Sequence, residues 1–170
     1  MSTLSVNNVT EVGGAPVVTA GVLDSGSLPT GTILQVVTSS DSSDRTTTST
    51  SLVDVTGMTI SITPQRADSK IIVICAVSVA SSGGTNEISF LDLTDSSNVS
   101  IVGAGSNNYV GNIGADNSYH YVPLIGEVSP GSVSPVTYKL RFRAAYAGQI
   151  ITIQNGNGFT GRMFAIEVAQ

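Results

Sequence analysis

Residues 136–146 read VTYKLRFRAAY, a stretch in which apolar and basic side chains alternate. Successive side chains of an extended strand point to opposite faces. One face would carry the apolar members, Tyr138, Leu140, Phe142 and Ala144. The other face would carry the basic members, Lys139, Arg141 and Arg143. The alternation therefore predicts a strand in a sheet that is packed on one side and wet on the other.

Similar patterns predict strands along most of the chain. Met58, Ile60 and Ile62 alternate with threonine and serine, and a last strand is predicted over 163–168. Residues 71–79, IIVICAVSV, are apolar almost throughout, which predicts a central strand that is buried on both faces or lies partly at a subunit interface. Six further strands are predicted near Thr32–Thr38, Thr47–Val55, Glu87–Leu93, Val99–Val102, Tyr119–Val128 and Gln149–Gln154.

Turn-forming residues separate these segments. The run Asn155–Gly158 (NGNG) supplies residues that tolerate a positive φ, and Ala147-Gly148 predicts a tight hairpin between the strands on either side of it. Helix-forming patterns are nearly absent. Roughly ten short strands, spaced about 8–12 residues apart, indicate an all-β chain folded as a two-sheet sandwich or barrel.

Composition narrows the class of protein. The chain has 170 residues, 7 basic against 12 acidic residues, a formal net charge of −5 and only 11% charged residues. This length suits one domain, or one domain with an arm. Net acidity with scattered basic residues argues against a nucleic-acid partner. No run approaches the ~20 apolar residues that span a bilayer, so we expect no membrane span. The opening MSTLSVNN lacks the features of a secretory signal, so we expect no such signal.

Residues 1–30 differ from the rest of the chain. They contain no aromatic and no basic residue, and glycines and prolines interrupt any long strand. They are nevertheless rich in apolar side chains, which linkers rarely are. Two interpretations remain open: an extended arm that packs on a neighbouring subunit or larger assembly, and a poorly ordered terminus. In the first, seven residues would make the contacts: Val6, Val9, Val12, Val17, Val18, Val22 and Leu23.

Residues suited to catalysis or metal binding are scarce. Cys75 lies inside the apolar run 71–79, where burial would make its thiol a small hydrophobic group. His120, the single histidine, has no nucleophile linked to it by a known motif, and one cysteine with one histidine cannot supply four soft ligands to zinc. The basic row on 139–143 could bind phosphate or an acidic sugar, although a solvated or salt-bridged sheet face is the simpler interpretation. We therefore expect no catalytic residue, no cofactor and no metal, and hence no enzyme.

The order of several longer segments carries a resemblance. The segments are Thr30–Thr38 (TGTILQVVT), Thr48–Ile62 (TSTSLVDVTGMTISI), Thr63–Ile74 (TPQRADSKIIVI), Pro135–Arg143 (PVTYKLRFR) and Arg162–Val168 (RMFAIEV). Together they resemble a β-sandwich module of tailed bacteriophages, especially marine phages and cyanophages, which is usually identified as a tail-fibre or virion structural protein. The opening MSTLSVNN is similar to the start of many such proteins. These motifs are signatures of fold, including a corner at 61–71 that sets a strand-to-strand crossing, and they carry over no binding residue.

The resemblance implies a fold and a place in a phage particle. The fold would be an antiparallel jelly-roll-like β-sandwich over residues 31–170, with an extended N-terminal docking arm over residues 1–30. The protein would be made in the host cytoplasm and would lie on the outer surface of the virion, as a homotrimer. One placement is a capsid decoration, or cement, protein that clamps neighbouring capsid subunits through its arm and apolar surfaces, with the major capsid protein or other virion proteins as partners. The alternative is a tail-fibre or spike module that recognises a host cell-surface glycan; a binding module outside phages is a third class.

Overall fold

The computed structural model describes residues 8–10, 16–19, 22–23, 25–82, 87–102, 108–112, 119–153 and 158–170. The regular elements in these ranges are strands, apart from one 3-10 turn at Ser25–Ser27. The strands are β1 (Asn8–Thr10), β2 (Pro16–Thr19), β3 (Val22–Leu23), β4 (Ile33–Asp41), β5 (Arg45–Thr47), β6 (Val53–Ile62), β7 (Lys70–Ser82), β8 (Glu87–Asp95), β9 (Asn108–Asn112), β10 (Tyr119–Val128), β11 (Val136–Ala144), β12 (Ile150–Ile153) and β13 (Gly161–Val168). Within these ranges, no helix has the length and apolar character needed to cross a membrane.

Strand β7 is the centre of the first sheet. One edge of β7 pairs with β10, and the other edge pairs with β13 over its first half and with β12 over its second half. β13 pairs in turn with β4, and β12 pairs with β5. β13 and β12 therefore lie end to end along this edge of β7. β4 and β5 likewise lie end to end in the next position, β4 beside β13 and β5 beside β12. This sheet is four strands wide, and all its pairs are antiparallel.

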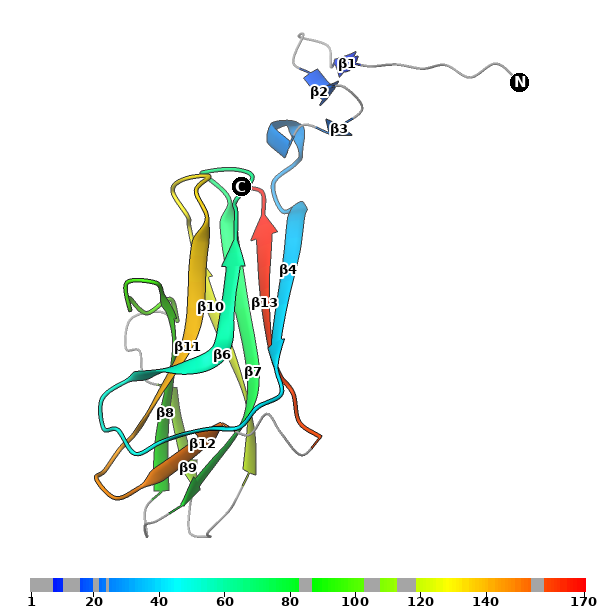
Figure 1. The fold of residues 1–170 in the computed structure, drawn as a ribbon. Coiled ribbons are helices and arrows are strands. Elements are labelled where there is room, and N and C mark those ends of the chain that lie inside the picture. Colours follow the sequence, from blue (N-terminus) through cyan, green and yellow to red (C-terminus); the bar gives the residue numbers. More distant parts are fainter. Residues whose placement is uncertain are drawn as a thin grey trace.

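The second sheet has the order β6-β11-β8-β9 and is also antiparallel. Figure 1 shows the two sheets as layers of one elongated body. The first sheet contains β4, β5, β7, β10, β12 and β13, and the second contains β6, β8, β9 and β11. The chain therefore passes from one sheet to the other at most of its connections. This strand order, with β4 and the last strand β13 adjacent in one sheet, is that of a jelly roll. The predicted all-β, jelly-roll-like antiparallel sandwich is confirmed.

The hydrophobic core lies between the two sheets and is built from alternating side chains. On β11 the four apolar side chains predicted to share a face are buried, while the three basic ones on the other face are partly exposed. Met58, Ile60 and Ile62 of β6 are likewise buried, and their threonine and serine neighbours face solvent. The inner face of β7 adds five residues to the core: Ile71, Val73, Cys75, Val77 and Val79. Removal of this apolar surface from water is the main force that holds the sheets together.

Residues 99–101 join the two sheets along one edge of the sandwich. The Ile101 amide donates to the carbonyl of Leu93 in β8 (2.9 Å), and the Ile101 carbonyl accepts from the amide of Glu127 in β10 (3.2 Å). The Ile101 side chain lies over Gly126, where a Cβ would come within 2.7 Å of Ile101 Cγ1. Glycine is therefore required at this position by the close approach of the two chains.

Some local predictions are wrong. Ala147 and Gly148 do not form a hairpin, because β11 belongs to the second sheet and β12 to the first. They instead form a tight turn between the sheets, in which the Gln149 amide donates to the Tyr146 carbonyl (3.4 Å) and Gly148 has a φ of 90°. The strand predicted at Val99–Val102 is reduced to one isolated bridge. Most of the predicted turn at 155–158 lies outside the described residues.

Candidate interaction surfaces

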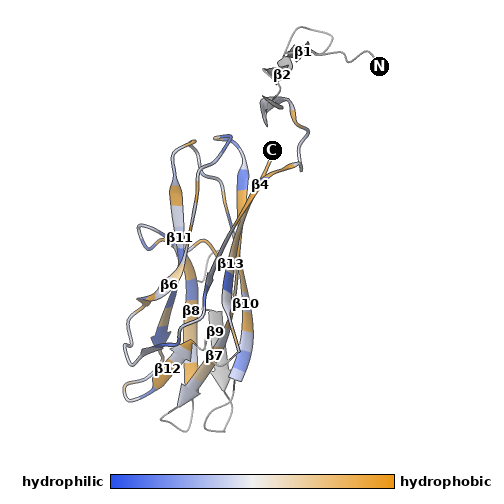
Figure 2. Ribbon diagram, turned by 45° about the vertical axis from the view of Figure 1, so that its right-hand side comes forward, coloured by the Kyte–Doolittle hydropathy of each residue, from blue (hydrophilic) through white to orange (hydrophobic). Residues whose placement is uncertain are grey.

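The arm predicted over residues 1–30 contains three short strands. β1 pairs with β2, and β2 pairs with β3, both antiparallel. Figures 1 and 2 show this small sheet beyond the end of the sandwich at which the C-terminus lies. Of the seven predicted contact residues, five lie in these strands: Val9, Val17, Val18, Val22 and Leu23. Val6 and Val12 fall outside the described residues, and docking by the arm stays a prediction.

Arg66 fastens the base of the arm to the sandwich. Its guanidinium pairs with both carboxylate oxygens of Asp68 (3.0 and 2.9 Å) and donates to the backbone carbonyls of Ser25 (3.4 Å) and Gln170 (3.0 Å). The Arg66 hydrogen bonds hold the pKa of Asp68 below its ordinary value. The arm therefore leaves the sandwich at a defined point, beside the C-terminus.

The same end of the sandwich is organised around the buried carboxylate of Glu167 on β13. Its oxygens accept hydrogen bonds from Gln35 Nε2 (2.6 Å), Ser69 Oγ (2.8 Å), and the backbone amides of Gln65 (2.8 Å) and Arg66 (3.1 Å). Burial by itself would raise the pKa of Glu167, but these donors outweigh burial and hold it below its ordinary value. Three of the donors belong to the corner quoted above, TPQRADSK, so a charge from the last strand holds the connection between β6 and β7 in place.

The outer side of the first sheet is apolar at its centre, and the Lys70–Glu127 ion pair borders this apolar area. Six side chains at its centre form what we call the outer face: Val36, Ile72, Ile74, Ile125, Phe164 and Ile166. The register of β10, β7, β13 and β4 places three of them in one row and three in the next. Ile125 is 60% exposed and Val36 is 53% exposed. Figure 2 shows hydrophobic residues on β4 and β10, the strands that border this face. A soluble monomer rarely exposes a continuous apolar patch, so the outer face is a candidate interaction surface.

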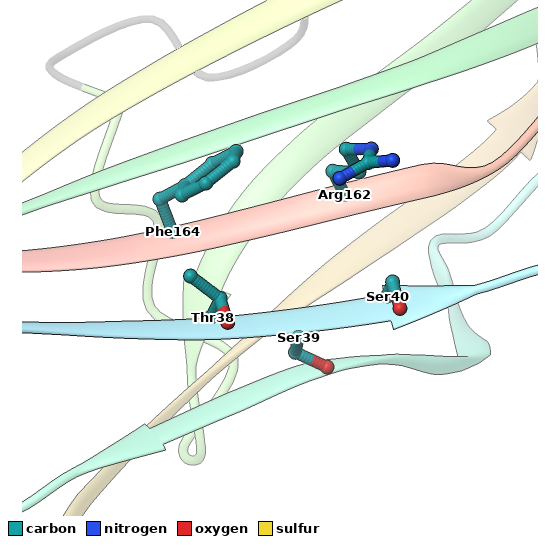
Figure 3. A pocket seen from close by; sticks show the side chains of 5 residues that line it. All are labelled: Thr38, Ser39, Ser40, Arg162 and Phe164. Carbon is teal, nitrogen blue, oxygen red and sulfur yellow. The ribbon is translucent and has the colours of Figure 1, made fainter.

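A shallow pocket of about 200 Å³ adjoins the outer face. It is lined by Thr38, Ser39 and Ser40 of β4 and by Arg162 and Phe164 of β13. In Figure 3 the side chains of Arg162 and Phe164 rise from the same side of β13. Arg162 is exposed, and within the part of the chain that the structure describes its side chain makes no hydrogen bond or ion pair. A guanidinium beside hydroxyl groups and an aromatic ring can receive a carboxylate or another anionic group.

The basic row on β11 is occupied by partners from its own sheet. Lys139 Nζ lies 2.8 Å from Asp54 Oδ2, and Arg141 Nε lies 2.9 Å from Asp54 Oδ1. The Arg143 guanidinium lies 3.8 Å from the ring centre of Phe90, at a cation–π distance. The Lys139 hydrogen bond is the largest reason that the pKa of Asp54 is below its ordinary value. The interpretation of this row as a salt-bridged sheet face is confirmed.

The single cysteine and histidine lie apart from each other. Cys75 is fully buried on β7, and burial raises its pKa to about 12, so the thiol stays protonated, as the sequence predicts. His120 is exposed on β10, between Tyr119 and Tyr121. Among the described residues, no group of three or more histidine, cysteine, aspartate or glutamate side chains is placed to hold a metal ion.

Sequence analysis did not single out two residues that the structure brings forward. The alternation of 163–168 places Glu167 on one face with Met163 and Ala165, but it does not show that this face is the inner one. Arg162 is the second residue of the same strand, and whether its side chain finds a partner depends on which strands flank β13. The apolar run at 71–79 was the available signal for the outer face, since it supplies both the core and the open side of β7.

Comparisons with known proteins give only distant likenesses. No protein-family model matches the sequence, and no curated protein matches it. Three similar solved structures come from infectious bursal disease virus. The Gx strain gives a TM-score of 0.41 at 14% identity over 80% of this chain, and a mutant VP2 protein from derived T=1 particles gives 0.38 at 14% over 79%. The Gt strain gives 0.37 at 13% over 98%. This chain spans 37%, 36% and 43% of those longer chains.

Proposed function

We propose that this chain is a structural protein of a bacteriophage virion and acts as a capsid decoration protein, without catalysis. The sequence resemblance to phage β-sandwich modules supplies the setting. The observation that carries the proposal is an apolar sheet face, open to solvent, on the same body from which a valine-rich arm projects. A protein with both features has two separate surfaces with which to hold its neighbours.

The proposed action is mechanical. Apolar contact contributes ~25 cal/mol per Å² of buried surface, so a contact of ~1,000 Å² supplies ~25 kcal/mol before the cost of association is subtracted. A small net gain, repeated over many copies, would hold capsid subunits together against the pressure of packaged DNA. The expected assembly is a homotrimer on the outer surface of the particle, with the major capsid protein as its partner.

Removal of the arm tests this function. A chain that lacks residues 1–24 keeps Ser25 and its hydrogen bond to Arg66, and thus keeps the base of the arm. We expect it to occupy undecorated particles at least tenfold less than the full chain. A matched variant keeps the length of the arm and replaces Val9, Val17 and Val18 by serine; it should lose occupancy in the same way. Normal occupancy by both variants would contradict the proposal.

The number of copies in each virion separates the two phage placements. Several hundred copies support a decoration protein, because a capsid presents many equivalent sites. A few dozen copies or fewer support a fibre or spike. Quantitative mass spectrometry of purified virions gives this number directly.

One observation favours the alternative, a receptor-binding module of a tail fibre. Tyr119 and Tyr121 are both more than half exposed on one face of β10, at the end of the sandwich away from the arm. Aromatic rings of this kind stack on sugars and offer a hydroxyl for hydrogen bonding. If the fibre placement is correct, the purified chain binds specific glycans on an array, and Tyr121→Ala reduces that binding while Tyr146→Ala, at another exposed tyrosine, does not.

A further inference from the structure

The surface around the outer face contains one positive charge without a partner. The other six basic side chains have described partners: Arg45, Arg66, Lys70, Lys139, Arg141 and Arg143. Arg162 has none among the residues that the structure describes. It lies two residues from Phe164 on the same side of β13, at the border of the apolar surface (Figure 3). A carboxylate delivered here by an apolar segment would form a bidentate pair from which water is partly excluded, and such pairs are among the strong ones.

The N-terminal arm has the complementary chemistry. Residues 1–30 contain two carboxylates, Glu11 and Asp24, and no basic residue. They also contain the seven valine and leucine residues named above. An arm of this composition brings apolar side chains for the outer face and a negative charge for Arg162, and it brings no charge that the guanidinium would repel.

The arm does not cover the outer face of its own chain. Its strands lie beyond the end of the sandwich in both Figures 1 and 2, and Arg66 holds Ser25 at that end. Strands of 3, 4 and 2 residues form a sheet too small to be stable alone. Fully extended, residues 1–24 reach about 80 Å, nearly twice the roughly 43 Å length of the 13-residue β7. The arm is therefore long enough to lie along a neighbouring molecule.

We propose that the outer face is the docking surface for the N-terminal arm of a second copy of this chain, and that a carboxylate of that arm pairs with Arg162. This inference rests on the proposed function, in which the arm is a docking element, and it names the partner. Four strands about 4.8 Å apart carry the two rows of the outer face and the row of Arg162, with about 6.7 Å between rows, and these three rows cover roughly 400 Å². Burial of that footprint removes about 800 Å² in total from the two surfaces, which is the size of a weak, reversible interface.

Self-association of the purified full chain tests the inference. Sedimentation equilibrium should show an oligomer at about 10–100 μM, and Ile125→Glu and Arg162→Glu should each raise the dissociation constant at least tenfold. Val99→Glu is the matched control, because Val99 is 61% exposed and Ile125 is 60% exposed, but Val99 lies on the turn after β8. It should change the constant less than twofold. Circular dichroism confirms folding, and Arg162→Gln replaces Arg162→Glu if the latter does not fold.

The arm itself is tested in the same assay. Replacing both arm carboxylates, Glu11→Gln with Asp24→Gln, should weaken self-association about as much as Arg162→Gln. A variant that combines the two arm changes with Arg162→Gln should self-associate no more weakly than the arm variant or Arg162→Gln alone, because each removes the same interaction. Additive effects would overturn the pairing with Arg162. If the face variants weaken association but the arm variants do not, two faces pack on each other and the arm is not the occupant.

Cross-linking distinguishes two arrangements: an arm that binds the outer face of a neighbouring molecule, and an arm that folds back on its own chain. Ser40→Cys on β4, combined with Val17→Cys in the arm, should give covalent dimers and larger species with a short thiol-reactive linker. A cross-linked monomer, or a wild-type chain that is monomeric at all concentrations, would overturn the inference. These measurements need no phage particle. A chain that self-associates but fails to decorate capsids therefore refutes the proposed function and leaves this inference standing, and the reverse result refutes only the inference.

Discussion

The carboxylate of Glu167 is fully buried and accepts hydrogen bonds from strand β4 and from the connection between β6 and β7. Burial of an ionised group is expensive unless donors replace the lost water, and here side-chain and backbone donors converge on the two oxygens. Gln35 approaches from β4, while Gln65 and Ser69 approach from the corner before β7. One charge thus ties together segments that are more than a hundred residues apart in sequence.

We expect Glu167→Gln to lower the free energy of unfolding by about 2–3 kcal/mol. The glutamine amide would place its own N–H groups against donors and would remove the charge that strengthens the remaining hydrogen bonds. Glu127→Gln is the control: Glu127 is exposed and pairs with Lys70, and loss of such a surface pair costs under ~1 kcal/mol. Urea denaturation of both variants measures the difference, and equal losses would show that Glu167 has no special role.

The pH dependence of stability follows from the same carboxylate. The pKa of Glu167 is lower in the folded chain than its ordinary value of 4.5, so the folded state binds fewer protons. This stabilisation is fully present above about pH 4.5 and is lost as the pH falls through the folded pKa. Asp54 and Asp68, whose pKa values are also lowered, act in the same direction. Asp92 acts in the opposite direction, because burial raises its pKa.

Wild-type stability should therefore decrease on acidification below about pH 4.5, and the Glu167→Gln variant should show a shallower decrease. Urea midpoints recorded between about pH 3 and pH 7 measure both slopes. Parallel slopes for the two chains would mean that Glu167 does not titrate with a lowered pKa.

The strand-like segment at 99–101 makes the two sheets continuous along one edge. It pairs with β8 on one side, and on the other side the Ile101 carbonyl accepts a hydrogen bond from the Glu127 amide of β10. An exposed sheet edge is a template for unwanted pairing, and this segment covers part of one. Gly126 makes this possible, because no side chain separates β10 from Ile101.

Gly126→Ala should lower the free energy of unfolding by about 1–3 kcal/mol. The new Cβ would lie 2.7 Å from Ile101 Cγ1 and 2.9 Å from the Ile101 carbonyl oxygen, so the backbone itself must move. Ser129→Ala, at an exposed position just after β10, serves as the control and should change stability by under ~0.5 kcal/mol. A Gly126→Ala chain as stable as the control would mean that the two sheets separate freely at this edge.

Sequence patterns predicted where the strands lie better than they predicted which strands pair with each other. β10 was predicted with its observed bounds and β11 nearly so, because alternation is a local property. β9, with the sequence NYVGN, was missed because polar residues and glycine are unfavourable in strands and only pairing with β8 keeps it extended. The insertion of β13 between β4 and β7 depends on contacts between distant segments, which no local pattern encodes. Glu167 and Arg162 acquire their roles only through that insertion.

The jelly-roll topology makes the whole molecule one cooperative unit. The last strand lies between the first long strand and the central one, so the sheet is complete only when the entire chain is in place. Folds dominated by such distant pairings fold in milliseconds to seconds rather than microseconds. Cys75, on β7 between β10 and β13, lies where any thiol reagent would need large-scale opening to reach it.

Cys75 should therefore report on unfolding of the whole molecule. We expect a thiol reagent such as dithionitrobenzoate to label the native chain at least ~10³-fold more slowly than the urea-unfolded chain. The Gly126→Ala and Glu167→Gln variants should label faster, by about tenfold for each ~1.4 kcal/mol by which the free energy of unfolding is lowered. Rapid labelling of the native wild type would show that β7 opens locally.

The contact of Arg66 with both Ser25 and Gln170 places the base of the arm and the last described residue at one pole of the body. A peptide fused after Gln170 would emerge beside the base of the arm and would interfere sterically with the docking proposed for the arm. A guest sequence inserted at Ala147-Gly148, in an exposed turn at the opposite pole, would point away from it. This turn is therefore the better site at which to insert a displayed peptide.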